Sequence, residues 1–482
     1  MDGARVFYPR AGSLGVCGPC ALTCGVETVH SKFLLAPALL ALSIVSAAQT
    51  ALPTDATVAA SSVAPLFPDA LRVDDVVAEA LRSNPEIRSA ERRIALAQSK
   101  TATARSLDDP MFQVRDWGTP LRKPWDLNQA QTMFMVQQTF IGKDKRNMRA
   151  QVSADEVEVA QAELESTRQQ VAAEVRKTAA DLLRNADEMR VHDRQSSLLK
   201  EAQQIALAQY TTGKVPQADV LRAQMALTRL SEHLIELDEQ RDTAVAQLNA
   251  LMGRRPDEPL ELAGAYRVID ALPSTDDLER MAIEHRPELA SLHREIVKGQ
   301  DESKNTRLAL KPDFTVGLGY MLMPSGTANR NAYMAELGMN LPTLNRARHD
   351  GEVRQADAAT AVTQSELEAR TTQVFLEIRQ AQIATLSAQK RVKLYRDTLL
   401  PQAEASFKAS TAAYQNNRAE FPMLIDSQNL LLDVQTAYYT ASAAMDAGIA
   451  SLELAVGTPI PTPPVATTKP SAPETATQET RK

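Results

Sequence analysis

Apolar residues recur at intervals of seven and four positions along two very long stretches of the chain. In residues 143–212, where neither proline nor glycine occurs, this spacing predicts one continuous helix packed as a coiled coil. At about 1.5 Å per residue, that helix would be ~100 Å long. Residues 345–416 show the same spacing, although Pro401 should kink the helix there. The apolar positions are Val157, Leu164, Val171, Val175, Leu182 and Met189 in the first stretch and Leu367, Val374, Ile378 and Ala381 in the second.

Shorter helices are predicted on either side of these stretches, bounded by glycine and proline. They are 76–108, 216–252, 275–309 and 423–456. Gly213 lies in the tight turn that ends the first long helix, and Asn417 lies in the corresponding turn after the second. Ser83 and Glu86 predict a capping box, so a new helix should begin near Pro85.

Between the helices lie four segments in which apolar residues alternate with small or polar ones. They are 111–117, 132–140, 313–322 and 333–341. The last two segments place on one face Phe314, Val316, Leu318, Tyr320, Tyr333, Leu337, Met339 and Leu341. Strands of this length with one apolar face are typical of membrane β-barrels, where that face contacts lipid. A soluble antiparallel sheet with one buried face would alternate in the same way.

Four strands are too few to close a barrel, and open strand edges cannot face lipid. If the apolar face contacts the outer membrane, several chains must therefore share one barrel. The strand pattern thus predicts an oligomer.

The chain contains one architectural unit twice. Asp74, Pro85, Glu86 and Pro110 reappear 202 positions later, and Tyr210, Gln224 and Gly253 reappear 204 positions later. An offset kept over this distance indicates a duplication. The helices 216–252 and 275–309 together match the length of 143–212, so we expect them to stack end to end beside it. Helices 76–108 and 423–456 should stack in the same way.

These elements define the expected divisions of the chain. They are a leader with a signal peptide (1–48), a linker (49–70), a first repeat (71–252), an equatorial connector (253–274), a second repeat (275–457) and a disordered tail (458–482). The leader has a short apolar run followed by small residues, which is typical of a secretory signal peptide and too short to span a bilayer. All cysteines lie in the leader, so the mature chain has no disulfide.

Composition and motifs exclude several functions. Aromatic residues make up only 4% of the chain, which is typical of long helices. The net charge of −7 argues against a nucleic-acid partner. Neither a Gly-rich phosphate loop nor a His-Glu-x-x-His motif is present, and the histidines show no ligand spacing. We therefore predict no enzyme activity, no cofactor and no metal site.

The ordered, duplicated motifs resemble those of the TolC-type outer-membrane efflux channels over about residues 71–457. The motifs are Asn84-Pro85-Glu86-Ile87, Asp219-Val220-Leu221 and Leu251-Met252-Gly253, with second-half counterparts Arg286-Pro287-Glu288-Leu289, Ile425-Asp426-Ser427-Gln428 and Val456-Gly457. The resemblance implies a mainly α fold with a small β part. Duplicated coiled-coil hairpins would form a periplasmic tunnel, and the strands of each chain would join a homotrimeric twelve-stranded β-barrel.

Asp108-Asp109-Pro110-Met111 and Phe140-Ile141-Gly142-Lys143 further resemble the heavy-metal-efflux branch of these channels. The implied function is a passive outer-membrane exit duct for heavy-metal cations. Its partners would be a periplasmic adaptor and an inner-membrane pump in an RND-type tripartite system. Two alternatives stay open: a drug-efflux or type I secretion channel of the same fold, and a periplasmic coiled-coil adaptor or scaffold.

The resemblance also places gate residues at the periplasmic tips of the hairpins. The candidates are Gly213 and Asp219 in the first turn and Asn417, Arg418 and Asp426 in the second. Converging carboxylates there would repel anions and attract cations. Arg418 corresponds to an arginine that pairs between helices in this family, whereas Met423 replaces one of the family's ring aspartates. The alternative for each charged residue is an ordinary solvated charge near a helix start.

Overall fold

The computed structural model describes residues 71–118, 122, 130–324, 326–327, 331–416 and 418–460. The expected signal peptide, the linker, Asn417 and the tail beyond residue 460 lie outside these residues. No described helix combines the length and the apolarity needed to cross a membrane.

The element order of the first repeat recurs in the second. The first repeat contains β1 (Leu71–Arg72), α1 (Val73–Ser83), α2 (Pro85–Arg105), β2 (Met111–Trp117), β3 (Gln131–Phe140), α3 (Lys143–Thr211) and α4 (Gln217–Leu251). After β4 (Leu262–Ala263), the second contains α5 (Thr275–His285), α6 (Pro287–Leu308), β5 (Phe314–Leu322), β6 (Asn331–Met339), the 3₁₀ turn η1 (Pro342–Asn345), α7 (Arg346–Leu394), the π-helical turn η2 (Tyr395–Leu399), α8 (Leu400–Gln415) and α9 (Phe421–Val456). The predicted mainly α fold with four long strands is confirmed.

The start of α2 differs from the predicted capping box. Asn84 is the N-cap, and its Oδ1 accepts hydrogen bonds from the N–H groups of Glu86 at 2.7 Å and Ile87 at 3.2 Å. Ser83 ends α1, and its hydroxyl lies within hydrogen-bond distance of two carbonyl oxygens, that of Glu79 at 2.6 Å and that of Met252 at 2.7 Å. An asparagine directly before Pro85 suits this role, because proline is favoured at the first helical position.

The expected single helix 275–309 is also two helices. Arg286 has extended backbone angles and separates α5 from α6. The cause is Pro287, since the residue before a proline is pushed out of the helical region.

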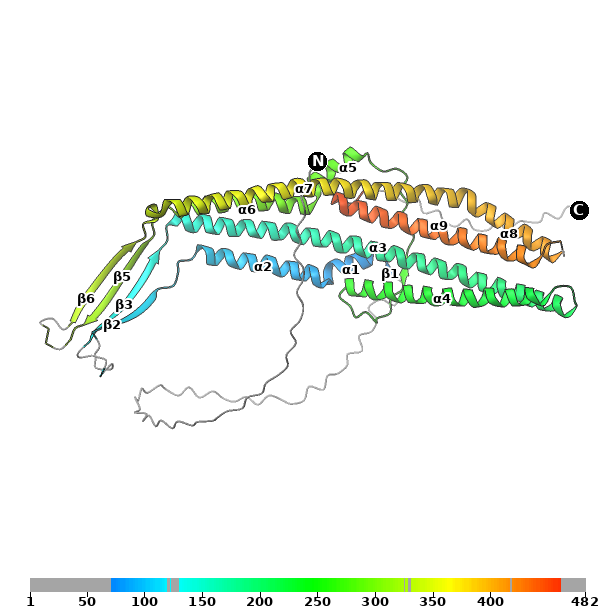
Figure 1. Cartoon of the computed structure of the whole chain (residues 1–482), viewed down its shortest axis with the longest axis horizontal. Coiled ribbons are helices and arrows are strands. Elements are labelled where there is room, and N and C mark those ends of the chain that lie inside the picture. The colour runs from blue at the N-terminus through cyan, green and yellow to red at the C-terminus, as the bar shows by residue number, and fades with distance from the viewer. Residues whose placement is uncertain are drawn as a thin grey trace, which may run out of the picture. The chain divides into compact units, whose positions relative to one another are not determined.

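The end of each return helix meets the start of the second helix of its own repeat, α2 or α6. Asn84 Nδ2 donates to the carbonyl of Leu251 at 2.8 Å, which joins the end of α4 to the start of α2. Arg286 donates to the carbonyl of Ala455 at 2.9 Å and joins α9 to α6. The predicted stacking of 216–252 with 275–309 is therefore wrong, and so is that of 76–108 with 423–456. Figure 1 shows α2 and α4 lying one after the other along α3, and α6 and α9 doing so along α7.

Near Pro401, where the sequence predicts a kink, the second long helix departs from regular α geometry. The π-helical turn η2 interrupts it immediately before Pro401. Pro401 has no N–H to offer the carbonyl of Asp397, and its ring would clash there in a regular α-helix. A local π turn relieves that clash without breaking the helix.

The long strands form one antiparallel sheet in the order β2-β3-β5-β6. Cross-strand partners are Phe314 with Met339, Val316 with Leu337, Leu318 with Ala335 and Tyr320 with Tyr333. These side chains therefore share one face, as predicted. Leu341 does not belong to it, because β6 ends at Met339 and Pro342 begins η1.

The apolar spacing of the long helices corresponds to buried residues. Val175 of α3 and Val374 and Ile378 of α7 are fully buried. They belong to two separate clusters, one around the α2–α4 junction and one around the α6–α9 junction. Each repeat thus has its own hydrophobic core beside its own helix junction.

Candidate functional site

The two helical hairpins turn at the same end of the bundle, opposite the sheet (Figure 1). Gly213, in the first turn, adopts φ +71°, and its N–H donates to the carbonyl of Tyr210 at 2.9 Å. A Cβ added at Gly213 would meet no atom within 4 Å. Positive φ, and not lack of space, therefore favours glycine here.

Asp219, the predicted acid of the first turn, is buried in the first turn of α4. Its Oδ1 lies 3.5 Å from Nη1 of Arg222, and its N–H donates to the carbonyl of Pro216 at 3.1 Å. The helix N-terminus also favours a negative charge at this position. Asp219 is therefore a buried, paired carboxylate and not an ordinary solvated charge.

The tips of the two hairpins pack against each other through a small apolar cluster. Tyr414 of α8 packs against Phe421 of α9, with ring centroids 5.7 Å apart. The Tyr414 hydroxyl donates to Oε1 of Gln209 on α3 at 3.3 Å. Burial raises the pKa of Tyr414, and the charge of Asp219 raises it further. The structure thus brings Tyr414 and Asp219 into one electrostatic environment.

The second turn is more open. The N–H of Arg418 donates to the carbonyl of Ala413 at 2.8 Å, and its side chain is exposed. Its guanidinium forms no ion pair with any residue the structure describes. Asp426 is also exposed, on α9. Within the described part of one chain, no ion pair joins Arg418 to Asp426.

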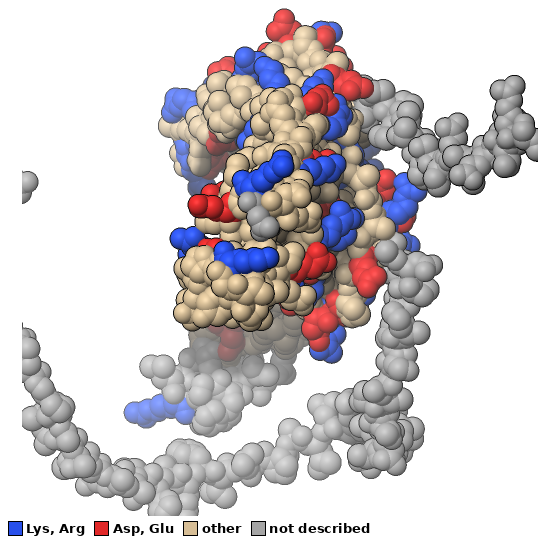
Figure 2. Space-filling model, turned by 90° about the vertical axis from the view of Figure 1, so that its right-hand side faces the viewer, with Lys and Arg blue, Asp and Glu red and all other residues tan. Residues whose placement is uncertain are grey.

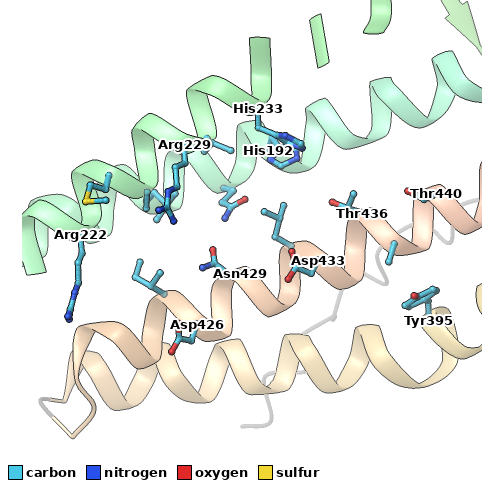
Figure 3. Close-up of a pocket in the computed structure, with 18 of the residues that line it drawn as sticks. His192, Arg222, Arg229, His233, Tyr395, Asp426, Asn429, Asp433, Thr436 and Thr440 are labelled. Carbon is cyan, nitrogen blue, oxygen red and sulfur yellow. The ribbon is translucent and has the colours of Figure 1, made fainter. Parts of the chain in front are cut away.

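A groove of about 830 Å³ runs from the tip along the hairpins, between α4 and α9 (Figure 3). Arg222 and Arg229 line it from α4, and Asp426 and Asp433 line it from α9. In the described part of the chain, no ion pair bridges these two walls. The groove thus has one basic and one acidic wall. Sequence analysis missed it because its lining comes from four helices far apart in the chain.

Two histidines touch at the floor of this groove. The rings of His192 on α3 and His233 on α4 have centroids 4.6 Å apart, at 66° (Figure 3). His192 is only 3% exposed. Burial lowers the pKa of His192 to about 4, and the neighbouring His233 adds to this effect while Asp193 opposes it. Groups of three or more His, Cys, Asp or Glu side chains suited to a metal ion are absent from the described residues.

At the opposite end of the bundle, the apolar face of the sheet is exposed. In β5, Phe314, Val316 and Leu318 are 47%, 41% and 67% exposed; in β6, Tyr333 and Leu337 are 89% and 77% exposed. The face continues across β2 and β3 through Phe112, Val114, Val136 and Phe140, which are also exposed. Such a large exposed apolar surface marks an interaction with lipid or protein.

Figure 2 shows the bundle end-on from the side of the hairpin turns. Acidic and basic side chains are interspersed there, and neither sign forms a continuous patch on this face. The tips therefore present a mixed charged surface.

A family model described as "Outer membrane efflux protein" matches residues 76–254 and 278–458. The two matched segments follow the two repeats. Together they cover well over half of the chain.

Among curated proteins, the chain is similar to the cobalt-zinc-cadmium resistance protein CzcC of Cupriavidus metallidurans, with 24% identity over 388 residues, 78% of this chain and 89% of that protein. Among solved structures, it is similar to the outer membrane protein VceC of Vibrio cholerae, with a TM-score of 0.65, 17% identity, and coverage of 80% of this chain and 96% of that one. It is also similar to CusC, with a TM-score of 0.65, 13% identity, and coverage of 82% and 96%. These likenesses establish a shared fold.

Proposed function

Because the chain belongs to the outer membrane efflux protein family, whose members are channels and not enzymes, we propose that it forms a homotrimeric exit duct for heavy-metal cations. The duct would cross the outer membrane through a shared β-barrel and reach into the periplasm with its helical hairpins. The alternative of a periplasmic adaptor or scaffold is excluded by the family.

The exposed apolar sheet with two free edges carries this proposal. Among the strands that the structure describes, β2 and β6 each pair on one side only. Backbone groups on a free edge cannot face lipid, because nothing there would satisfy their hydrogen bonds. Pairing β2 of one copy with β6 of the next removes both edges, and three copies would close a ring of twelve strands. The face that carries Phe314, Tyr333 and Leu337 would then contact lipid.

The likeness to CzcC supports heavy-metal cations as the cargo, since it extends over 89% of a cobalt-zinc-cadmium resistance protein. A passive duct needs an energy source elsewhere. We therefore assign it a periplasmic adaptor and an inner-membrane pump as partners, with the adaptor meeting the mixed charged surface of the tips (Figure 2).

Deleting the gene tests the cargo. The deletion strain should lose tolerance to Zn²⁺, Co²⁺ or Cd²⁺, and the intact gene should restore it. Unchanged metal tolerance with lost tolerance to organic drugs, or with lost secretion of a polypeptide, would contradict a metal cargo and favour the drug-efflux or secretion alternative.

We further propose that the tips close the duct, with Asp219, Arg418 and Asp426 as gate residues beside Gly213 and Asn417. The exposed Arg418 and Asp426 are available for partners on neighbouring copies. Arg418→Ala or Asp426→Ala should raise the conductance of single channels in planar bilayers. Arg92→Ala on the exposed surface of α2, far from the tips, is the matched control. Conductance equal to wild type for both tip variants would count against a gate at this place.

A further inference from the structure

We propose that His192, His233 and Gln195 form a binding site for a borderline divalent cation such as Zn²⁺ on the floor of the tip groove. The inference builds on the proposed metal cargo and adds a specific place where the cargo binds. It also replaces the expectation from sequence that the chain has no metal site.

The first observation is an unsatisfied buried imidazole. Both Nδ1 and Nε2 of His192 are buried, and neither atom has a hydrogen-bond partner among the residues that the structure describes. Leaving a buried polar group without a partner is unfavourable, so such groups are rare in folded proteins. His192 is one of the residues that line the groove, so its unsatisfied ring lies directly beside that space.

The second observation is the orientation of the neighbouring ring. His233 is half-buried, and its Nδ1 lies 3.0 Å from Oε2 of Glu236. A carboxylate beside Nδ1 favours the proton on that nitrogen and leaves the lone pair on Nε2. Histidines that bind metals are commonly oriented in this way by a carboxylate. His233 is therefore prepared to act as a ligand through Nε2.

The third observation is a buried amide oxygen in the same groove. Gln195 lies one helical turn after His192 on α3, and its buried Oε1 has no hydrogen-bond partner in the described part of the chain. Residues three apart on a helix point to the same side. Two imidazole nitrogens and one amide oxygen, completed by water from the groove, suit Zn²⁺, Co²⁺ or Ni²⁺ better than Mg²⁺ or Ca²⁺, which prefer all-oxygen sites.

A set with only two imidazoles and one neutral oxygen should bind weakly and release readily, as transport demands.

Zinc binding to the purified, detergent-solubilised mature protein tests the site. The protein should carry no polyhistidine tag, and ZnCl₂ should be titrated by isothermal calorimetry. We expect one Zn²⁺ per chain, and His233→Ala should weaken its binding at least tenfold. His349 of α7 is the matched control, because its Nδ1 also lies beside a glutamate three residues later, Glu352, at 3.1 Å. His349→Ala should leave binding unchanged.

Cobalt absorption gives a second measurement that depends on coordination. Co²⁺ bound by two imidazoles should show a ligand-field band that disappears in His233→Ala. An unaltered band in His233→Ala, or an equal loss of zinc binding in His349→Ala, would overturn the site. Neither result would affect the efflux proposal, which depends on metal tolerance of the deletion strain and not on zinc affinity.

Discussion

The two helix junctions occupy equivalent places in the two repeats, yet different chemistry stabilises them. In the first repeat, the amide of Asn84 bridges to the carbonyl of Leu251. In the second, the equivalent residue is Arg286, which bridges to Ala455 and also contacts Glu288 at 3.0 Å and Glu377 at 2.7 Å. Both repeats thus have a side chain bonded to the carbonyl at the end of the return helix. That side chain is a neutral amide in the first repeat and a charged guanidinium in the second.

The two tips differ in a similar way. Tyr414 is 4% exposed and joins the second hairpin to the first, whereas its counterpart Tyr210 is 42% exposed. Likewise, Asp219 is 7% exposed, and its counterpart Met423 is 58% exposed. The second hairpin therefore packs against the first through Tyr414, whereas the buried acid, Asp219, belongs to the first hairpin. Equivalent sequence positions have acquired different roles.

Removing the central residue of each junction should have the largest effect. Arg286→Ala removes the buried guanidinium that pairs with Glu288 and Glu377. We therefore expect a loss of about 3–5 kcal/mol in the free energy of unfolding. Asn84→Ala removes a cap and one bridging hydrogen bond and should cost about 1–2 kcal/mol. Guanidinium unfolding followed by circular dichroism measures both. An equal loss of stability in the two variants would contradict the view that a charged contact stabilises the second junction more than a neutral one stabilises the first.

The stability of the two junctions should also differ in its dependence on acidic pH. Burial opposes ionisation of Glu288, but bonds to Arg370 and Arg286 outweigh it and lower the pKa of Glu288 below its usual 4.5. This stabilisation is complete above pH 4.5 and disappears as the pH falls through the lowered value. Arg286→Ala should therefore lose part of this acid sensitivity, whereas Asn84→Ala should keep it.

Truncating the two tyrosines compares the tips. Tyr414→Ala removes a buried aromatic ring and should cost about 3 kcal/mol. Tyr210→Ala removes an exposed ring and should change stability by less than about 0.5 kcal/mol. Thermal unfolding of both variants in detergent provides the measurement. A similar loss in both would show that the tips are equivalent after all.

Three glycines at positive φ distinguish the tightly packed helix junctions from the open tip of the first hairpin. A Cβ at Gly457 would lie 2.7 Å from Cα of Arg286, and one at Gly253 would lie 2.6 Å from the carbonyl oxygen of Ser83. Gly457→Ala and Gly253→Ala should each cost about 2 kcal/mol or more, because a clash adds to the left-handed strain. Gly213→Ala, in open space, should cost about 1 kcal/mol. If Gly213→Ala lost the most stability of the three variants, the close backbone contacts at the junctions would be refuted.

The last prediction concerns the pH dependence of stability in the first hairpin. His192 has a pKa of about 4 when folded, against an ordinary value of 6.5. The unfolded chain therefore binds a proton first, so stability should fall as the pH drops from 6.5 toward 4, by at most about 1.4 kcal/mol per pH unit. His192→Gln should remove this slope in chemical unfolding series. The second hairpin offers no buried histidine at its tip and should contribute no such slope.

Sequence periodicity predicted the element order well, because coiled-coil spacing and strand alternation are local patterns. It predicted the wrong helix stacking for a physical reason. Helix α2 has 21 residues and α6 has 22, while α4 has 35 and α9 has 36. Lengths this similar fit either pairing equally, and only contacts such as that of Asn84 with Leu251 distinguish them.

The candidate site was predictable only in part. Gly213, Asp219 and Asp426 follow recognisable turns, so their place at the tips could be predicted. His192 and His233 lie on two antiparallel helices, far apart in the chain, and Gln195 is no conventional ligand. Their proximity depends on the register between α3 and α4, which spacing along one helix does not reveal.

The number of copies in the purified mature protein tests the central claim most directly. Native mass spectrometry of the protein released from outer-membrane fractions in detergent should give the mass of three chains, since only pairing of β2 with β6 of another copy removes the free sheet edges. A stable single chain that needs no detergent to stay in solution would contradict the account.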